Sequence, residues 1–138
     1  MVFSEESHRI HAKLAARRLN LNERRSGVAI VSLVQLLANP ERYHNKPVCL
    51  EGFLRVEFEG CGIYLSRDDA NYLINSNSLW VSFGGDWKGQ GLEPKQFNRK
   101  FVLIEGIFKQ DDHGHMGMWS GSVHDVWRVM ELIKFHND

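Results

Sequence analysis

The chain has 138 residues, of which 43% are hydrophobic and 25% charged, and its formal net charge is zero. This length fits a single domain that buries a core without disulfides or metal. No apolar run approaches the roughly 18 residues that span a bilayer. Because Met1–Glu6 does not start a basic segment followed by an apolar one, we expect no signal peptide and a cytoplasmic location, with no membrane partner. The two cysteines, Cys49 and Cys61, are expected to stay reduced.

The net charge conceals an asymmetry between two parts of the chain. Residues 1–27 carry six Lys/Arg and three Asp/Glu, whereas residues 28–138 carry eleven and fourteen. We therefore expect a basic, helical or flexible extension over 1–27 and a mildly acidic domain over 28–138. An acidic domain surface disfavours nucleic-acid binding, which usually requires a basic patch.

Two helices are predicted at the start of the chain. Ile10, Leu14, Ala15 and Leu19 recur at helical spacing and indicate a helix over 5–25. A shorter helix is predicted over 32–38, with a serine at position 32 as its N-cap and Pro40 ending it.

Five strands are predicted after these helices. The first covers 48–58 and alternates strictly, with Val48, Leu54 and Phe58 among the residues on one face. The second and third cover 62–66 and 78–83, separated by a loop or helical turn over 67–73. A glycine-rich loop around Trp87 and a helical turn over 94–97 precede the fourth strand, at 100–108. Central glycines in the first and fourth strands, Gly52 and Gly106, suggest bulges or bends.

The fifth strand is predicted over 122–133. Its alternation places Val123, Asp125, Trp127 and Val129 on one face. Between strands four and five lies the loop of residues 111–117, which holds two aspartates, two histidines and two glycines. Loops braced by a sheet are where binding and catalytic residues concentrate.

This order of elements resembles the OB-fold, a five-stranded Greek-key barrel. The segments 43–52 and 101–108 resemble strands of bacterial OB-like domains of the tRNA-anticodon-binding type. The segments 54–60, 79–81 and 112–117 resemble a family of small bacterial proteins with no established activity. The resemblance implies a mainly β fold, a five-stranded OB-like barrel with a short leading helix and an N-terminal helical extension. It brings no catalytic residues, and a fold does not by itself give a function.

The loop over 111–117 allows three interpretations. In an extended chain His113 and His115 would project to the same side, together with Asp111, as a two-His, one-carboxylate metal site would require. The glycines indicate instead a curled turn in which an aspartate accepts from backbone N–H groups. The third interpretation is a loop that contacts a partner.

Nucleophilic catalysis is a weaker hypothesis. Ser120 and Ser122 lie near the histidines in sequence, and Asp112 or Asp125 could orient one of them. However, no nucleophile-elbow pattern is present. A Cys61–histidine pair would need an approach in space that the sequence does not specify.

The sequence therefore favours a non-catalytic cytosolic binding protein without a cofactor. Its most concrete form is an immunity- or antitoxin-like protein that blocks a protein partner, possibly a toxin. The expected contact residues are Trp87, Asp111, Asp112, His113, His115 and Trp119. One alternative is a single-stranded nucleic-acid-binding module that uses Phe53, Tyr64, Trp80, Arg17 and Arg18. The other is a metal-dependent enzyme that uses the Asp/His loop.

Overall fold

The computed structural model describes residues 4–22, 27–58, 60–84 and 93–135, and over 16–22 it describes the backbone alone. The helices are α1 (Glu5–Asn22), α2 (Leu33–Ala38), α3 (Pro40–Tyr43) and α4 (Arg67–Asn71), with 3-10 turns η1 (Asn75–Asn77), η2 (Pro94–Phe97) and η3 (His115–Gly117). The strands are β1 (Ala29–Ile30), β2 (Pro47–Arg55), β3 (Gly62–Tyr64), β4 (Leu79–Val81), β5 (Lys100–Lys109) and β6 (Ser122–Glu131).

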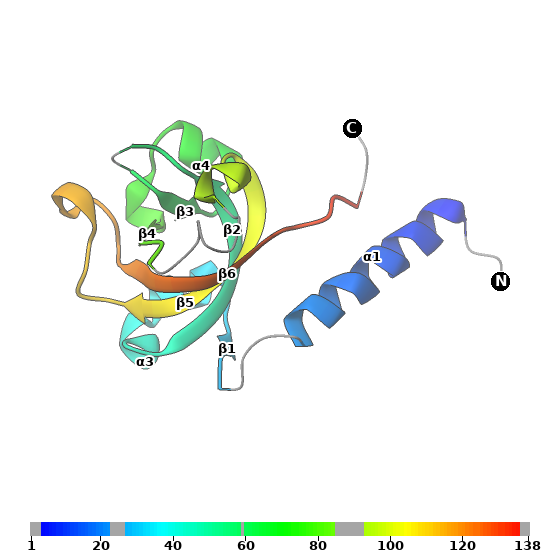
Figure 1. Ribbon diagram of the computed structural model, residues 1–138, viewed down its shortest axis with the longest axis horizontal. Coiled ribbons are helices and arrows are strands. Elements are labelled where there is room, and N and C mark those ends of the chain that lie inside the picture. The colour runs from blue at the N-terminus through cyan, green and yellow to red at the C-terminus, as the bar shows by residue number, and fades with distance from the viewer. Residues whose placement is uncertain (1–3, 23–26, 59, 85–92, 136–138) are drawn as a thin grey trace.

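Five of these strands close into a barrel (Figure 1). Their order is β2-β3-β4-β6-β5, and β5 pairs back with β2. All these pairs are antiparallel except β4–β6, which is parallel. This is the strand order of an OB-like barrel, as the sequence predicted. The short strand β1 was not predicted; it adds to β2 in parallel, with Ala29 opposite Val48.

The two central glycines allow the strands to approach closely where the barrel bends. A Cβ on Gly52 would lie 2.6 Å from Ile63 Cγ1 and 2.8 Å from the Tyr64 carbonyl oxygen. A Cβ on Gly106 would lie 2.6 Å from Val123 Cγ1. No side chain fits at either position without moving a neighbouring strand. The pairing of β5 with β6 is irregular beside Gly106, the bulge that the sequence allowed, whereas β2 pairs with β5 without a shift through Gly52.

The interior is filled by the aliphatic residues of alternating strand positions. Its largest cluster comprises Val31, Leu33, Leu36, Val48, Leu50, Leu54, Ile63, Leu79, Val81, Val102, Ile104, Phe108, Val123, Val126 and Val129. Leu33 and Leu36 come from α2, whose predicted N-cap is confirmed by a capping box between Ser32 and Gln35. Pro40 does not only end α2; it also opens α3 at the first helical positions.

The predicted alternation of the last strand is wrong over its middle. Glu105 pairs with Arg128, but Ile107 pairs with His124, so β6 has extra residues opposite Gly106. Asp125 lies in this bulge with a φ of 51°. The bulge interrupts the alternation of inward- and outward-facing residues, so that Val126 faces the core instead of Asp125 and Trp127.

The first predicted strand is also shorter than expected. β2 ends at Arg55, and the Val56 N–H donates to Asn98 Oδ1 at 2.7 Å instead of continuing a strand ladder. Phe58, predicted to share a strand face with Val48 and Leu54, is instead fully exposed in the β2–β3 loop (residues 56–61).

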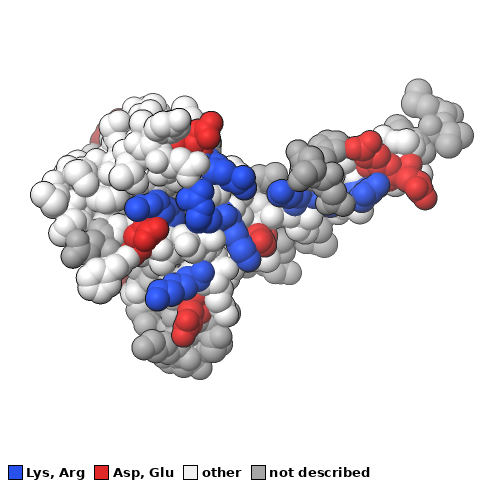
Figure 2. Space-filling view, turned by 90° about the horizontal axis from the view of Figure 1, so that it is seen from above, with Lys and Arg blue, Asp and Glu red and all other residues white. Residues whose placement is uncertain are grey.

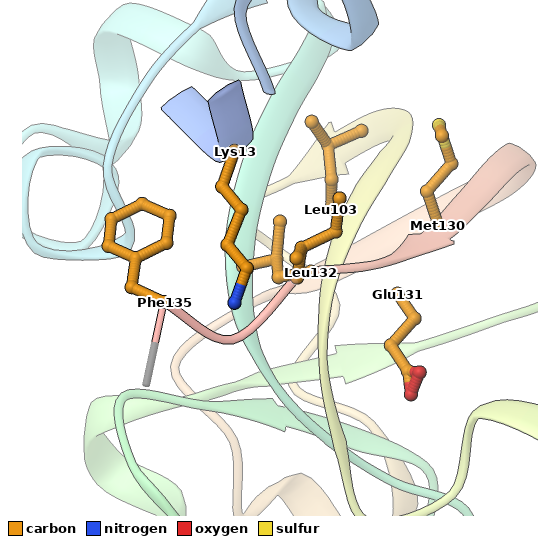
Figure 3. Close-up of a pocket in the computed structure, with 7 residues that line it drawn as sticks. Lys13, Leu103, Met130, Glu131, Leu132 and Phe135 are labelled. Atoms are coloured by element: carbon orange, nitrogen blue, oxygen red, sulfur yellow. The ribbon is translucent and has the colours of Figure 1, made fainter. Parts of the chain in front are cut away.

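The helix α1 extends away from the barrel (Figure 1). Lys13 reaches from α1 toward the segment that follows β6, between Phe135 and Leu132 in the view of Figure 3, and its ammonium donates to the Lys134 carbonyl oxygen. Within the described residues, no helix combines the length and the apolar character that crossing a membrane would need.

Candidate functional site at the β5–β6 loop

The β5–β6 loop (residues 110–121) is closed by hydrogen bonds at its base. His113 Nδ1 lies 2.8 Å from the Trp119 carbonyl oxygen, and the Trp119 N–H donates to the His113 carbonyl at 3.0 Å. Within this closure the Gly117 N–H donates to the Gly114 carbonyl at 3.0 Å. These bonds hold the loop tip in one conformation within the folded chain.

Asp112 anchors the loop to the following strand. Its Oδ1 accepts from the Gly114 N–H at 3.0 Å, the aspartate turn that the sequence allowed. Its Oδ2 lies 2.5 Å from Nε2 of His124, in β6. The bond from the Gly114 backbone N–H, together with those from His124 and Ser122, holds the pKa of Asp112 below its ordinary value despite partial desolvation.

The loop lies against two packed tryptophans. Trp80 and Trp119 meet edge to face, with ring centroids 4.9 Å apart. A Cβ on Gly114 would lie 2.7 Å from three atoms of Trp80, including its Cβ, so only glycine fits there. Trp119 also lies beside Gly60 of the β2–β3 loop, 3.8 Å from where a Cβ would stand. The two loops therefore meet at Trp119 and form one rim.

Apolar side chains project from this rim into solvent. Met116 is 80% exposed and Met118 50% exposed on the β5–β6 loop, and Phe58 is fully exposed on the β2–β3 loop. Met116 has a φ of 59°, a left-handed conformation that costs a non-glycine residue about 1–2 kcal/mol. Backbone strain of this kind persists where the surrounding structure imposes it, and it clusters at functional sites.

The predicted contact residues divide into exposed and buried ones. Asp111, His113 and His115 are exposed, and Asp112 is half-buried. Trp119, in contrast, is 4% exposed and supports the rim from beneath. Trp87 lies outside the described residues. Sequence reasoning missed Met116, Met118 and Phe58, because nothing in the local pattern distinguishes an apolar residue held outward from one held in the core.

The two loop histidines are not aligned as an extended chain would align them. Gly114, with φ 70° and ψ −163°, turns the backbone between His113 and His115. Nδ1 of His113 is engaged by the Trp119 carbonyl oxygen. In the described part of the chain, no three His, Cys, Asp or Glu side chains gather as a metal site would require.

The serine, histidine and aspartate beside the loop do not form a relay. Ser122 Oγ and Asp112 Oδ2 both approach the same nitrogen, Nε2 of His124, at 2.9 and 2.5 Å. In a catalytic triad the serine and the carboxylate bind opposite ring nitrogens. Ser122 is also fully buried. Burial raises the pKa of the Cys61 thiol, which keeps it protonated, and its Sγ donates to the Glu57 carbonyl.

The aromatic residues predicted to stack nucleic-acid bases are largely covered. Phe53 and Tyr64 pair across β2 and β3, and both are fully buried with Ala70 of α4 against them. The Tyr64 hydroxyl donates to Asn75 Oδ1, of η1, at 2.7 Å. A base could reach these rings only if α4 moved away. Trp80 is partly exposed, and Arg17 and Arg18 lie in the part of α1 whose side chains are not described.

Two hollows on the described part of the surface hold no cluster of groups suited to catalysis. The larger, of about 390 Å³, lies between β1, α2 and β2 and is lined mainly by aliphatic residues such as Ile30, Val34 and Leu65. The smaller, between α1 and the segment after β6, holds Lys13 and Glu131 as its charged groups (Figure 3). Glu131 pairs with Lys100 at 3.4 Å.

Comparisons with known proteins identify no family for this chain. No family model and no curated protein matches the sequence. Among solved structures, the chain is similar to one described as an aspartyl-tRNA synthetase from Leishmania major Friedlin, with 12% identity and a TM-score of 0.46. The match covers 80% of this chain and 22% of that one, so this chain spans about a fifth of the synthetase's length. We base the OB-like assignment on the strand order.

Proposed function

We propose that this chain is a non-catalytic protein-binding module that engages a protein partner through the rim of the β2–β3 and β5–β6 loops. The observation that carries the proposal is Met116, held 80% exposed in a left-handed conformation by a hydrogen-bonded loop. A loop that is ordered in advance loses little conformational entropy on binding. Exposed Met and Phe side chains suit the apolar centre of a protein interface.

In finer detail, we propose an immunity- or antitoxin-like protein of the small bacterial family that the motifs resemble, acting in the cytoplasm. Residues 28–138 carry three more acidic than basic residues, which favours a basic partner such as a nuclease. The nucleic-acid alternative is less well supported, because two of its stacking rings are buried beneath α4.

The rim can be tested by site-specific photo-crosslinking in the native host. A photoreactive amino acid at Met116 or Phe58 is expected to give one discrete adduct containing a second protein. Lys46, which is also exposed but outside both loops, serves as the control position. If no adduct forms at Met116 and Phe58, or if the same adduct also forms at Lys46, the rim is not the contact site.

The immunity hypothesis has its own test. The gene next to this one is expressed alone and together with this chain. We expect growth arrest that this chain relieves and that a Met116→Asp variant relieves poorly. If the neighbouring product is harmless, or if rescue does not depend on the rim, the immunity role is wrong.

A further inference from the structure

A second surface, distinct from the rim, lies over α4. Two arginines cover the ring of Phe53: the guanidinium carbon of Arg67 lies 5.8 Å from the ring centroid and that of Arg99 lies 5.4 Å from it. Arg99 also donates from Nη2 to Asn71 Oδ1 at 2.7 Å, which ties it to the end of α4. Among the described residues, neither guanidinium has a carboxylate within 4.0 Å.

The charge of this surface is visible from above the barrel. Figure 2 shows lysine and arginine side chains gathered on this face, with fewer acidic ones among them. A guanidinium carries five N–H donors, so its contact with the Phe53 ring leaves donors available for a further partner. Two neighbouring cations that meet no carboxylate within the described part of the chain can receive carboxylate or phosphate oxygens.

Apolar side chains project beside these cations. Tyr72, Leu73 and Ile74 follow α4 directly and are 78%, 50% and 37% exposed. Leu73 has a φ of 52°, so a leucine occupies a conformation that suits Gly or Asn. Backbone hydrogen bonds from Tyr72, Leu73 and Ile74 back to α4 hold this tip in place. Phe101, on β5 and 42% exposed, packs edge to face on Phe53 at 5.1 Å.

We propose that this surface, formed by Arg67, Arg99, Phe101 and residues 72–74, binds an acidic protein segment that also carries apolar side chains. Its carboxylates would pair with the two guanidiniums, and its apolar residues would cover Leu73 and Tyr72. Tyr and Arg are the residue types that dominate the energy of protein interfaces. The proposal goes beyond the rim and does not depend on it.

A protein segment fits this surface better than a nucleic acid does. The face of Phe53 that a base would stack on is occupied by the guanidiniums. Leu73 and Ile74 offer aliphatic surface, which a sugar-phosphate chain does not cover.

The test uses fluorescence anisotropy on the full chain with three labelled probes. The first is a short synthetic peptide of alternating glutamate and leucine, the second its glutamine analogue, and the third an oligothymidylate of equal charge. We expect the acidic peptide to bind more tightly than the other two, and more weakly as salt is added. If the acidic peptide does not bind, or if the oligothymidylate binds more tightly, the proposal is overturned.

Variants locate the binding surface. Arg67→Gln combined with Arg99→Asn, which tolerates the φ of 61° at position 99, is expected to weaken peptide binding about tenfold. The matched control, Arg42→Gln with Lys46→Gln, removes the same charge beside α3, on the opposite side of the barrel (Figure 1). Equal weakening by both pairs would mean non-specific attraction and would overturn the site.

Leu73→Asn provides a second readout. It removes the aliphatic tip and relieves the left-handed strain, so thermal stability should rise slightly while peptide binding weakens. A structural role for Leu73 predicts the opposite change in stability. Unchanged peptide binding in this variant would contradict the role of residues 72–74 in the surface.

Discussion

The contact between Gly114 and Trp80 determines how the β5–β6 loop is held, and two alanine substitutions can measure it. Gly114 and Gly117 belong to the same loop and have φ values of 70° and 66°. A Cβ on Gly114 would stand 2.7 Å from Trp80, whereas a Cβ on Gly117 would meet nothing within 4 Å. The pair therefore compares a position where a collision adds to the cost of the backbone conformation with one where no collision occurs.

The expected losses in the free energy of unfolding follow from the backbone conformation at each glycine and from the collision with Trp80. Gly117→Ala should cost about 1–2 kcal/mol, the penalty of a left-handed alanine. Gly114→Ala should cost about 2–6 kcal/mol, because its ψ of −163° lies in a region that is nearly confined to glycine and because overpacking adds to the strain. Trp80 cannot simply rotate away, since the contacts include its Cβ and its ring lies on Trp119.

Urea unfolding followed by tryptophan fluorescence measures both losses. The free energy of unfolding of Gly114→Ala should lie about 2.5 kcal/mol below that of Gly117→Ala, which is the difference between the centres of the two ranges. Quenching by acrylamide in the native state should also increase in Gly114→Ala alone, because the Trp80–Trp119 pair opens. Equal losses in the two variants would refute the conclusion that the loop is held against Trp80.

Three further predictions concern charge and strain. Because the pKa of Asp112 is lowered in the folded chain, its ionised form adds stability above the ordinary carboxyl range, at pH above about 4, and this contribution is lost as the pH falls through the lowered pKa. Asp112→Asn keeps an Oδ1 that can still accept from Gly114. Its melting temperature should lie below that of the wild type at neutral pH, and the two values should converge in acid. A difference in melting temperature that does not depend on pH would contradict this prediction. Arg128→Met should cost about 3–5 kcal/mol in urea unfolding, because Glu105 is fully buried and its Oε2 is 3.0 Å from Arg128, and adding Glu105→Leu should restore most of the loss. If the double variant is no more stable than the single one, the buried pair is not the cause. Met116→Gly should raise the free energy of unfolding by about 1 kcal/mol through release of the left-handed strain, although it removes the apolar tip, and a destabilised variant would argue against strain at this position.

The strands were predictable where both faces of the barrel follow a simple alternation. The sequence located β2 and β5 and their glycine bends, because period-2 burial and a central glycine determine such strands locally. The sequence did not predict which residues in the middle of β6 face the core, because the bulge at Asp125 interrupts the alternation there. That bulge lies opposite Gly106 on the neighbouring strand, and the alternation within one strand contains no information about the strand it pairs with.

The candidate site was predictable in its local turn but not in its surroundings. The bond from the Gly114 N–H to Asp112 spans two residues, and a local motif predicts it. The contact of Asp112 with His124 joins the loop to β6, and the burial of Phe53 and Tyr64 depends on α4. Of the residues of α4, Ala70 alone is buried, so nothing in its composition indicates that it covers two aromatic rings.

The position of α4 changes which surfaces of this OB-like barrel can reach a ligand. In OB-folds the face of the second and third strands and the adjoining loops commonly bind ligands. Here that face belongs to β3 and β4. Tyr64, the last residue of β3, donates a hydrogen bond from its hydroxyl to Asn75 of η1, and it packs against Ala70 of α4. Binding across it would require breaking the Ser66 cap of α4, in which Oγ accepts from the Asp69 N–H at 3.1 Å, and exposing two buried rings. Binding at the proposed loop rim or at the proposed arginine surface would require neither change, so it would cost less free energy than binding across β3 and β4.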